Sequence, residues 1–211
     1  KYFAAHLPLY PALIKVGHGI LNFLGLNNDG LGYLKSMLSV NILATLGLSG
    51  FFYFFLKKLN LTKNPLLLTA IFLFLPRFFV VRTVGAPESI FLLLIMTSIY
   101  FFEKNKYLLA GLLGGLAVMT KTPGMLLFGA YCLVFVERLL LLKSGSADIK
   151  NTPDRNWLWI LFIPFGLFMV FVIYFFRMGD FLAYFNSGDN IHLVFPFAVF
   201  NFGKTWVGTA W

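Results

Sequence analysis

The sequence predicts an all-α protein, a polytopic bundle of transmembrane helices. Of its 211 residues, 59% are hydrophobic and 12% are charged, whereas a soluble domain carries about 25% charged residues. Two apolar runs, 36–56 and 156–176, contain no charged residue and are long enough to cross a bilayer. Because one crossing takes about 20 residues, the length allows about six spanning or partly spanning helices and no sizeable soluble domain. We therefore expect a single transmembrane domain over 1–211.

The segment 1–34 is expected to lie on the outer side of the membrane, at its interface. Its apolar stretch 7–26 holds two prolines, three glycines, Lys15 and His18. That mixture predicts a broken or interfacial helix rather than a crossing. Turn-forming residues then occupy 27–30, just before the first span.

The segment 35–177 is expected to form the helical bundle. Between its two full-length spans lie four shorter apolar runs, each bounded or interrupted by charge or proline: 64–76, 89–102, 107–120 and 122–142. Gly111 and Gly115 have the spacing of small residues that predicts close contact between helix backbones. The last segment, 178–211, mixes Gly, Asp and Asn with many aromatic residues and is expected to form an outer interfacial loop.

The charge pattern indicates a membrane topology rather than a nucleic-acid-binding surface. The net charge is +9, from 17 Lys and Arg against 8 Asp and Glu, but the basic residues are scattered between the apolar runs. The loops 57–63, 103–106 and 143–155 fall on one side and are rich in lysine, so we assign that side to the cytoplasm. No nucleic-acid partner is expected; the partners expected are membrane lipids.

Several chemistries are disfavoured by the sequence itself. It has no Asp-x-Asp pair, no phosphate-binding Gly-rich loop, no nucleophile elbow and no His-Glu-x-x-His motif. His6, His18 and His192 lack the spacing of metal ligands, so no metal is expected. The single Cys132 excludes an internal disulfide. The sequence starts at Lys1 without Met and is expected to be a fragment.

Four charged residues are expected near the outer face, where helices begin or end. Arg77, Arg82 and Lys121 are positive, and Glu88 is the carboxylate among them. An ionisable group in the membrane costs about 2.5–3.5 kcal/mol, so this cluster needs partners or a function. The surplus of positive charge predicts an outward-opening cavity that binds the phosphate of an anionic headgroup. In the alternative interpretation, Arg82 and Lys121 are interfacial residues and Glu88 pairs with Arg82.

The other acidic residues on the outer side stand beside Gly or Asn and are expected to form turns: Asp29, Asp180 and Asp189.

Four segments, taken in order, resemble integral-membrane GT-C glycosyltransferases, especially relatives of the GPI mannosyltransferase II family. Leu-Pro-Leu-Tyr-Pro at 7–11 is similar to that family's Phe-Pro-Leu-Tyr-Pro-type segment. Ala-Pro-Glu-Ser-Ile-Phe-Leu at 86–92 is similar to its Tyr-Ser/Thr-Glu-Ser-Leu-Phe segment. The stretch 108–124 resembles its Ala-Gly-Leu…Leu-Thr-Arg…Gly helix pair, and Gly-Asp-Phe-Leu-Ala-Tyr-Phe at 179–185 resembles its Gly-Asp-Pro-Leu-Ala-Phe outer loop.

Departures from the family pattern suggest a divergent relative in the cytoplasmic membrane of a prokaryote. Pro87 replaces the Tyr-Ser/Thr lead, Lys121 replaces Arg, and Phe181 replaces Pro. The resemblance implies a multi-pass enzyme that transfers a hexose, with mannose expected, from a polyprenyl-phosphate-sugar donor to a lipid-linked or cell-surface acceptor on the outer face. It also implies an acidic catalytic base on the first outer loop, which is expected upstream of Lys1.

In the leading hypothesis, the transfer inverts the configuration at the anomeric carbon of the sugar. Positive side chains stabilise the negative charge that builds on the departing phosphate. The residues assigned to the donor phosphate are Arg77, Arg82 and Lys121. The residues assigned to orienting the substrates are Glu88, Tyr10 and His6. No cofactor besides the lipid-linked donor is expected. Two alternatives stay open: a transporter or flippase of an anionic lipid or sugar phosphate, and a membrane scaffold without catalytic activity.

Overall fold

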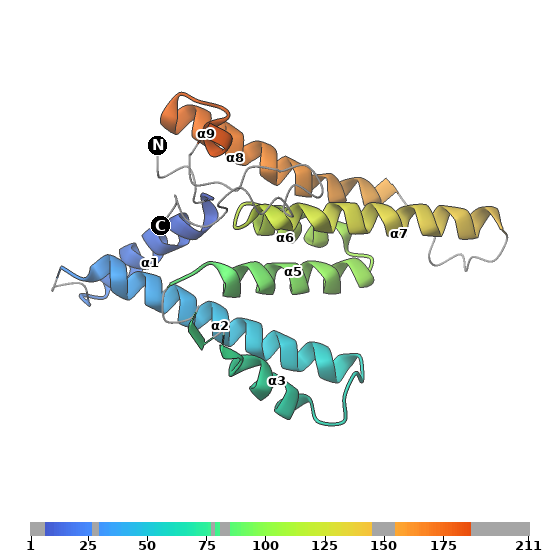
Figure 1. Ribbon diagram of the computed structural model, residues 1–211, viewed down its shortest axis with the longest axis horizontal. Helices are drawn as coiled ribbons and strands as arrows, with labels where there is room; N and C mark the ends of the chain where they lie inside the picture. The colour runs from blue at the N-terminus through green and yellow to red at the C-terminus, as the bar shows by residue number, and fades with distance from the viewer. Residues whose placement is uncertain (1–6, 27–29, 77–78, 81–84, 145–154, 187–211) are drawn as a thin grey trace, which may run out of the picture. The chain divides into compact units, whose positions relative to one another are not determined.

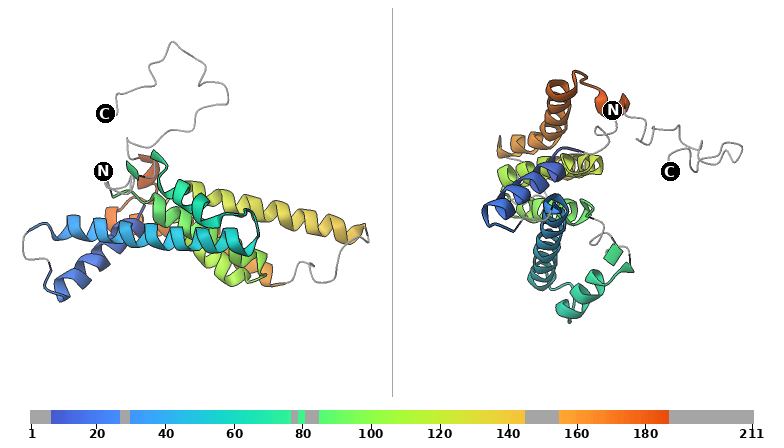
Figure 2. Two further views of the ribbon diagram at one scale, coloured as in Figure 1. Left: turned by 90° about the horizontal axis from the view of Figure 1, so that it is seen from below. Right: turned by 90° about the vertical axis from the view of Figure 1, so that its left-hand side faces the viewer.

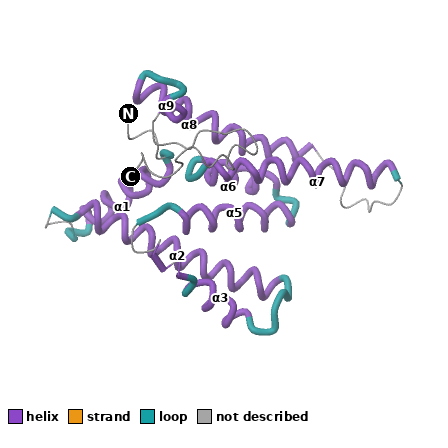
Figure 3. The backbone as a smooth tube through the Cα atoms, viewed as in Figure 1, coloured by secondary structure: helices purple, strands orange, loops and turns teal. Residues whose placement is uncertain are grey.

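The computed structural model describes residues 7–26, 30–76, 79–80, 85–144 and 155–186 (Figure 1). Figure 3 shows that the regular structure in these ranges is helical, with no strand, so the all-α class is confirmed for them. Contacts within the chain divide it into two compact units. One is Leu7–Met169, and the other is described over 170–186.

The first helix, α1 (Leu9–Phe23), is continuous, so of the two forms expected for 7–26, a broken or an interfacial helix, the broken one is excluded. Pro8 is its N-cap and Pro11 falls in its first turn, where backbone N–H groups have no partner inside a helix and proline therefore removes no hydrogen bond. Gly25, with a φ of 71°, follows the end of the helix in the left-handed conformation typical of such ends. With 15 residues, α1 is too short to cross a bilayer, and this length is consistent with the interfacial helix expected here.

The longest helix, α2 (Gly32–Lys58), runs back along α1 and then continues beside α5 (Glu88–Glu103), as Figure 2 shows. The short α3 (Pro65–Leu73) folds back onto the second half of α2. Its contact includes the rings of Phe52 and Phe72, whose centroids lie 4.6 Å apart. α2 is thus the helix that connects the N-terminal hairpin to the rest of this unit.

The α5 helix and α6 (Tyr107–Val118) form a tight hairpin, joined by a turn in which Asn105 has a φ of 56°. Asparagine tolerates this left-handed conformation better than most residues do. The remaining helical segments follow in order: the 3-10 turn Thr122–Met125, α7 (Leu126–Lys143), the 3-10 segment Arg155–Leu161, α8 (Phe162–Met178) and α9 (Ala183–Asn186).

Three helical stretches among the described residues are long and apolar enough to cross a membrane: Gly32–Lys58, Thr122–Lys143 and Arg155–Met178. They contain the predicted spans 36–56 and 156–176 and cover the predicted apolar run 122–142. Large apolar side chains are exposed on them, for example Leu126 at 76% and Leu133 at 72%. Exposing such surface to water is unfavourable, whereas lipid chains cover it without cost, so these helices indicate a membrane protein.

The predicted close contact at Gly111 and Gly115 is confirmed. A Cβ atom added at Gly111 would overlap the carbonyl oxygen of Trp159, and one added at Gly115 would lie 2.5 Å from the carbonyl oxygen of Phe162. Gly166 faces Gly115 in return, because its added Cβ would lie 2.5 Å from the Gly115 carbonyl oxygen. The α6 helix therefore meets the following helices backbone against backbone, which only residues without a side chain allow.

The core of the first unit combines stacked aromatic rings with a buried hydroxyl. Phe102 and Tyr131 stack with ring centroids 3.9 Å apart, and Trp157 meets Phe102 edge-on at 5.2 Å. Ser98 donates a hydrogen bond of 2.8 Å to the carbonyl of Ala110 and lies 2.9 Å from the Tyr131 hydroxyl. Because a buried hydroxyl is costly unless it is hydrogen-bonded, these contacts fix α5, α6 and α7 in one arrangement.

The described part of the second unit ends in a turn after α8. Gly179 has a φ of 70°, and the Asp180 carboxylate accepts hydrogen bonds from the Leu182 N–H at 2.9 Å and the Asn186 side-chain amide at 2.8 Å. The turn-forming role expected of Asp180 is confirmed. The same expectation for Asp29 and Asp189, and the predicted outer loop beyond Asn186, lie outside the described residues.

Candidate functional site

Three segments that are far apart in the sequence meet at one end of the α5–α6 hairpin. They are the start of α1, the turn that leads into α5, and the turn that follows α6. The Leu9 N–H donates a hydrogen bond of 3.2 Å to the Met119 carbonyl. The Tyr10 hydroxyl donates one of 2.5 Å to the Gly85 carbonyl. These two bonds attach α1 to both turns and define the candidate site.

An ion pair lies at the centre of this meeting point. The Lys121 ammonium nitrogen is 2.5 Å from Glu88 Oε1, and the two side chains are 34% and 24% exposed, respectively. Glu88 is the first residue of α5, where the positive end of the helix dipole favours a carboxylate. Lys121 stands in an extended conformation, with a φ of −149°, between α6 and the 3-10 turn. The structure thus pairs Glu88 with Lys121, the residue 33 positions later.

The second oxygen of Glu88 has a different environment from the first. Oε2 is buried and accepts no hydrogen bond from the described residues. A buried acceptor without a donor is unfavourable, so this oxygen can accept a hydrogen bond from a group that the described residues do not supply. The Lys121 ammonium has three N–H donors and donates one of them to Oε1, so the others can bind another acceptor.

The hydroxyl of Tyr10 is held in its protonated form. Tyr10 is only 8% exposed and packs with Ala44 and Ile90. Burial, and to a smaller extent the negative charge of Glu88, raise the pKa of Tyr10 from 10.0 to about 12. Near neutral pH, Tyr10 is therefore a hydrogen-bond donor that stays fixed on the Gly85 carbonyl.

Two further contacts position the turn before α5 and the start of α5. Gly85 has a φ of 68°, and an added Cβ there would overlap the side chain of Met37, so no other residue fits without movement. Directly after Glu88, the Ser89 hydroxyl lies 2.9 Å from the Thr45 hydroxyl, and both residues are buried. This contact holds the start of α5 against the middle of α2.

Of the residues that the sequence assigned to substrates, the structure brings together Tyr10, Glu88 and Lys121. Arg77, Arg82 and His6 lie outside the described residues. No site role was predicted for Gly85, Thr45 or Ser89 from the sequence. A glycine placed two residues before a proline is a signal that could have drawn attention to Gly85.

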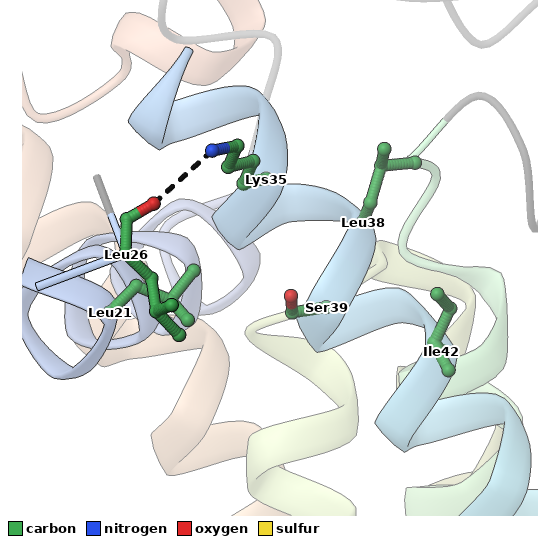
Figure 4. Close-up of a pocket in the computed structure, with 6 residues that line it drawn as sticks. All are labelled: Leu21, Leu26, Lys35, Leu38, Ser39 and Ile42. Atoms are coloured by element: carbon green, nitrogen blue, oxygen red, sulfur yellow. Dashed lines mark hydrogen bonds between the residues drawn. The ribbon is translucent and has the colours of Figure 1, made fainter. Parts of the chain in front are cut away.

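A separate pocket of about 390 Å³ lies between α1 and α2, toward the end of α1 opposite Tyr10. Figure 4 shows its lining side chains: Leu21, Leu26, Lys35, Leu38, Ser39 and Ile42. The wall is mostly apolar, and the Lys35 ammonium donates a hydrogen bond of 3.2 Å to the Leu26 carbonyl. The pocket therefore presents an apolar surface beside a single positive charge.

Comparisons with protein-family models, with curated proteins and with solved structures give no match for this chain. The resemblance to GT-C glycosyltransferases consequently rests on the four sequence segments.

Proposed function

We propose that this protein is a membrane glycosyltransferase that moves a hexose, with mannose favoured, from a polyprenyl-phosphate-sugar donor to a lipid-linked or cell-surface acceptor. The observation that carries the proposal is the meeting of Tyr10, Glu88 and Lys121. These residues come from three of the segments on which the family resemblance rests, and they converge at one end of a helical hairpin. The proposed location is the cytoplasmic membrane of a prokaryote, with the site on its outer side.

The chemistry available at the site suits a sugar attached to a phosphate. Glu88 Oε2 is an acceptor suited to a sugar hydroxyl, while Oε1 orients Lys121. The spare donors of Lys121, together with Arg77 and Arg82, supply positive charge for the phosphate as its bond to the sugar breaks. Tyr10 holds the turn at Gly85, and with His6 it is assigned to the acceptor side.

The proposed topology has six spanning or partly spanning helices, with α3, α5 and α6 added to the three long ones. The lysine-rich turns then face the cytoplasm, and the Glu88–Lys121 pair faces outward. The apolar pocket between α1 and α2 supplies a surface for the hydrocarbon chain of a lipid substrate on this outer side.

The test uses membranes that contain the protein and a polyprenyl phosphate carrying a radiolabelled mannose. We expect the label to become covalently attached to a new product. Arg77→Ala and Arg82→Ala should each abolish this transfer while expression is unchanged, and Lys57→Ala, on the lysine-rich side, should leave it intact. Full turnover in both arginine variants would contradict the phosphate assignment. Label that crosses the bilayer while still on its donor would instead identify a transporter or flippase.

A further inference from the structure

Arg138 is held rigidly at the other end of the α5–α6 hairpin, away from the Glu88–Lys121 pair. Its Nη1 atom donates a hydrogen bond of 3.2 Å to the Tyr107 hydroxyl and lies 3.5 Å from Asn105 Oδ1. The Tyr107 hydroxyl in turn donates to Asn105 Oδ1 at 2.6 Å. One edge of the guanidinium is therefore fixed by the turn between α5 and α6.

Two aromatic rings make cation–π contacts with the same guanidinium. Its Cζ atom is 5.3 Å from the ring centroid of Trp157 and 5.8 Å from that of Phe102. Both rings are buried, at 7% and 2% exposure. Cation–π contacts of this kind orient an arginine, but they do not neutralise its charge.

All four groups that hold Arg138 are uncharged. Among the described residues, no carboxylate lies within the 4.0 Å that defines an ion pair with it. The described acidic residues at this end of the hairpin are Glu103, at the end of α5, and Glu137, beside Arg138; both are exposed and pair with no described residue. A fixed positive charge thus remains at this end of the bundle.

Other positive side chains belong to the segments that meet at this end of the hairpin. Arg138 is joined by four exposed basic residues on the turn, on the end of α7 and at the start of the 3-10 segment: Lys104, Lys106, Lys143 and Arg155. The ammonium groups of Lys104 and Lys106 lie 5.9 Å and 6.0 Å from the ring centroids of Tyr100 and Phe101. Among the described residues at this end of the bundle, positive charges therefore outnumber negative ones, even when both glutamates are counted.

Arg138 lies near one end of a stretch that is long and apolar enough to span a membrane, where an arginine side chain can reach the lipid headgroups. It stands five residues before the end of Thr122–Lys143, about 7.5 Å along the helix axis. Trp157 and Tyr107 beside it are the residue types that concentrate at the membrane interface. A guanidinium at this depth meets lipid phosphates, and its planar donors match two phosphate oxygens at once.

We propose that Arg138, with Lys104, Lys106, Lys143 and Arg155 around it, binds the headgroup of an anionic phospholipid on the lysine-rich side of the membrane. The Nη2 and Nε donors of Arg138, which no described residue uses, face the phosphate, and the surrounding lysines select a lipid with net negative charge. This site is independent of the glycosyltransferase proposal, because it lies at the opposite end of α5 and requires no chemical step.

The test is a lipid titration of the purified protein, read by native mass spectrometry, with phosphatidylglycerol and phosphatidylcholine of the same acyl chains. We expect the wild type to retain phosphatidylglycerol in preference. Arg138→Gln should weaken phosphatidylglycerol binding about tenfold, because it removes both the charge and the planar donors. The matched control is Lys57→Gln, which removes another cation resting on a single ring, and its effect should stay below about threefold.

Arg138→Lys keeps the positive charge and the packing but loses the fork of donors, so it tests the site even if the glutamine variant does not fold. It should weaken binding by at least about threefold. Equal retention of the two lipids by the wild type would overturn the proposal. So would wild-type affinity in Arg138→Lys, or equal losses in Arg138→Gln and Lys57→Gln.

Discussion

The Lys121 ammonium and the Glu88 carboxylate lie 2.5 Å apart, although one belongs to the turn that ends α6 and the other begins α5. The pair connects the two helices of the hairpin at their open end, opposite the tight turn at Asn105. Because both side chains are partly shielded from solvent, the pair is expected to contribute more than a fully exposed one.

A double-mutant cycle measures that contribution. Glu88→Gln, Lys121→Met and the double variant should give a coupling free energy of about 1 kcal/mol in unfolding experiments in detergent micelles. The control cycle uses Glu103→Gln and Lys63→Met, two exposed residues that form no ion pair with each other. Equal coupling in the two cycles would show that the Glu88–Lys121 contact adds nothing to stability.

The contact of α6 with the helices that follow predicts different effects for different glycines. Gly111→Ala and Gly115→Ala each place a methyl group against a backbone carbonyl, so each should lower the free energy of unfolding by about 1–3 kcal/mol. Gly50→Ala and Gly129→Ala add a methyl group where no atom lies within 4 Å. Those variants should be neutral or stabilising by about 0.5–1 kcal/mol. Thermal unfolding compares them, and equal melting temperatures in the two sets would refute the backbone contact.

The buried hydroxyl pair between α2 and α5 predicts non-additive effects. Thr45→Val removes the hydrogen-bond partner of the Ser89 hydroxyl and should lower the free energy of unfolding by about 1–2 kcal/mol, because that buried hydroxyl then lacks this partner. Ser89→Ala should have a smaller effect, since the Thr45 hydroxyl still donates a hydrogen bond of 2.8 Å to the Asn41 carbonyl. The double variant should be more stable than the sum of the two predicts. Strict additivity in chemical denaturation would mean that the hydroxyls do not interact.

Tyr10 predicts a change in stability at high pH. The pKa of Tyr10 in the folded protein is about 12, raised from 10.0, so the folded state holds this proton more tightly than the unfolded chain does. The stabilisation is complete below pH 10 and is lost as the pH rises toward 12. Tyr10→Phe should therefore show a smaller fall in melting temperature across this interval than the wild type.

The control for Tyr10 is Tyr33→Phe, a change at an exposed tyrosine of α2. Its pH profile should match that of the wild type. A Tyr10→Phe profile that also matches would contradict the link between Tyr10 and the site. At neutral pH, Tyr10→Phe should lose about 1 kcal/mol through its missing bond to Gly85.

Long uninterrupted apolar runs made much of the fold predictable. The runs 36–56 and 156–176 lie in helical stretches because about twenty largely apolar residues without a charge satisfy both the length and the backbone hydrogen bonding that a bilayer demands. The glycine spacing at Gly111 and Gly115 was equally informative, because glycines four residues apart lie on one face of a helix and let another backbone approach that face closely. Local patterns of this kind do not depend on distant parts of the chain.

Long-range pairing was harder to predict. The sequence offered Arg82 as a structural partner of Glu88, and Arg82 lies outside the described residues, whereas the contact with Lys121, 33 positions away, was not predicted. The prolines at 8 and 11 suggested a break in α1, although proline disrupts a helix only beyond its first turn. No site role was predicted for Arg138, because the groups that hold it come from the α5–α6 hairpin and from the 3-10 segment Arg155–Leu161, both separate from α7 in the sequence.

The bond from the Leu9 N–H to the Met119 carbonyl also sets an order of events during synthesis. The helix that carries Leu9 is synthesised before its anchor, because the carbonyl of Met119 is made more than a hundred residues later. A nascent chain that stops before Met119 therefore holds α1 without this anchor and without Lys121. Tyr10, Glu88 and Lys121 can assemble only after the whole α5–α6 hairpin has been synthesised, so completion of that hairpin is the step at which this region of the protein matures.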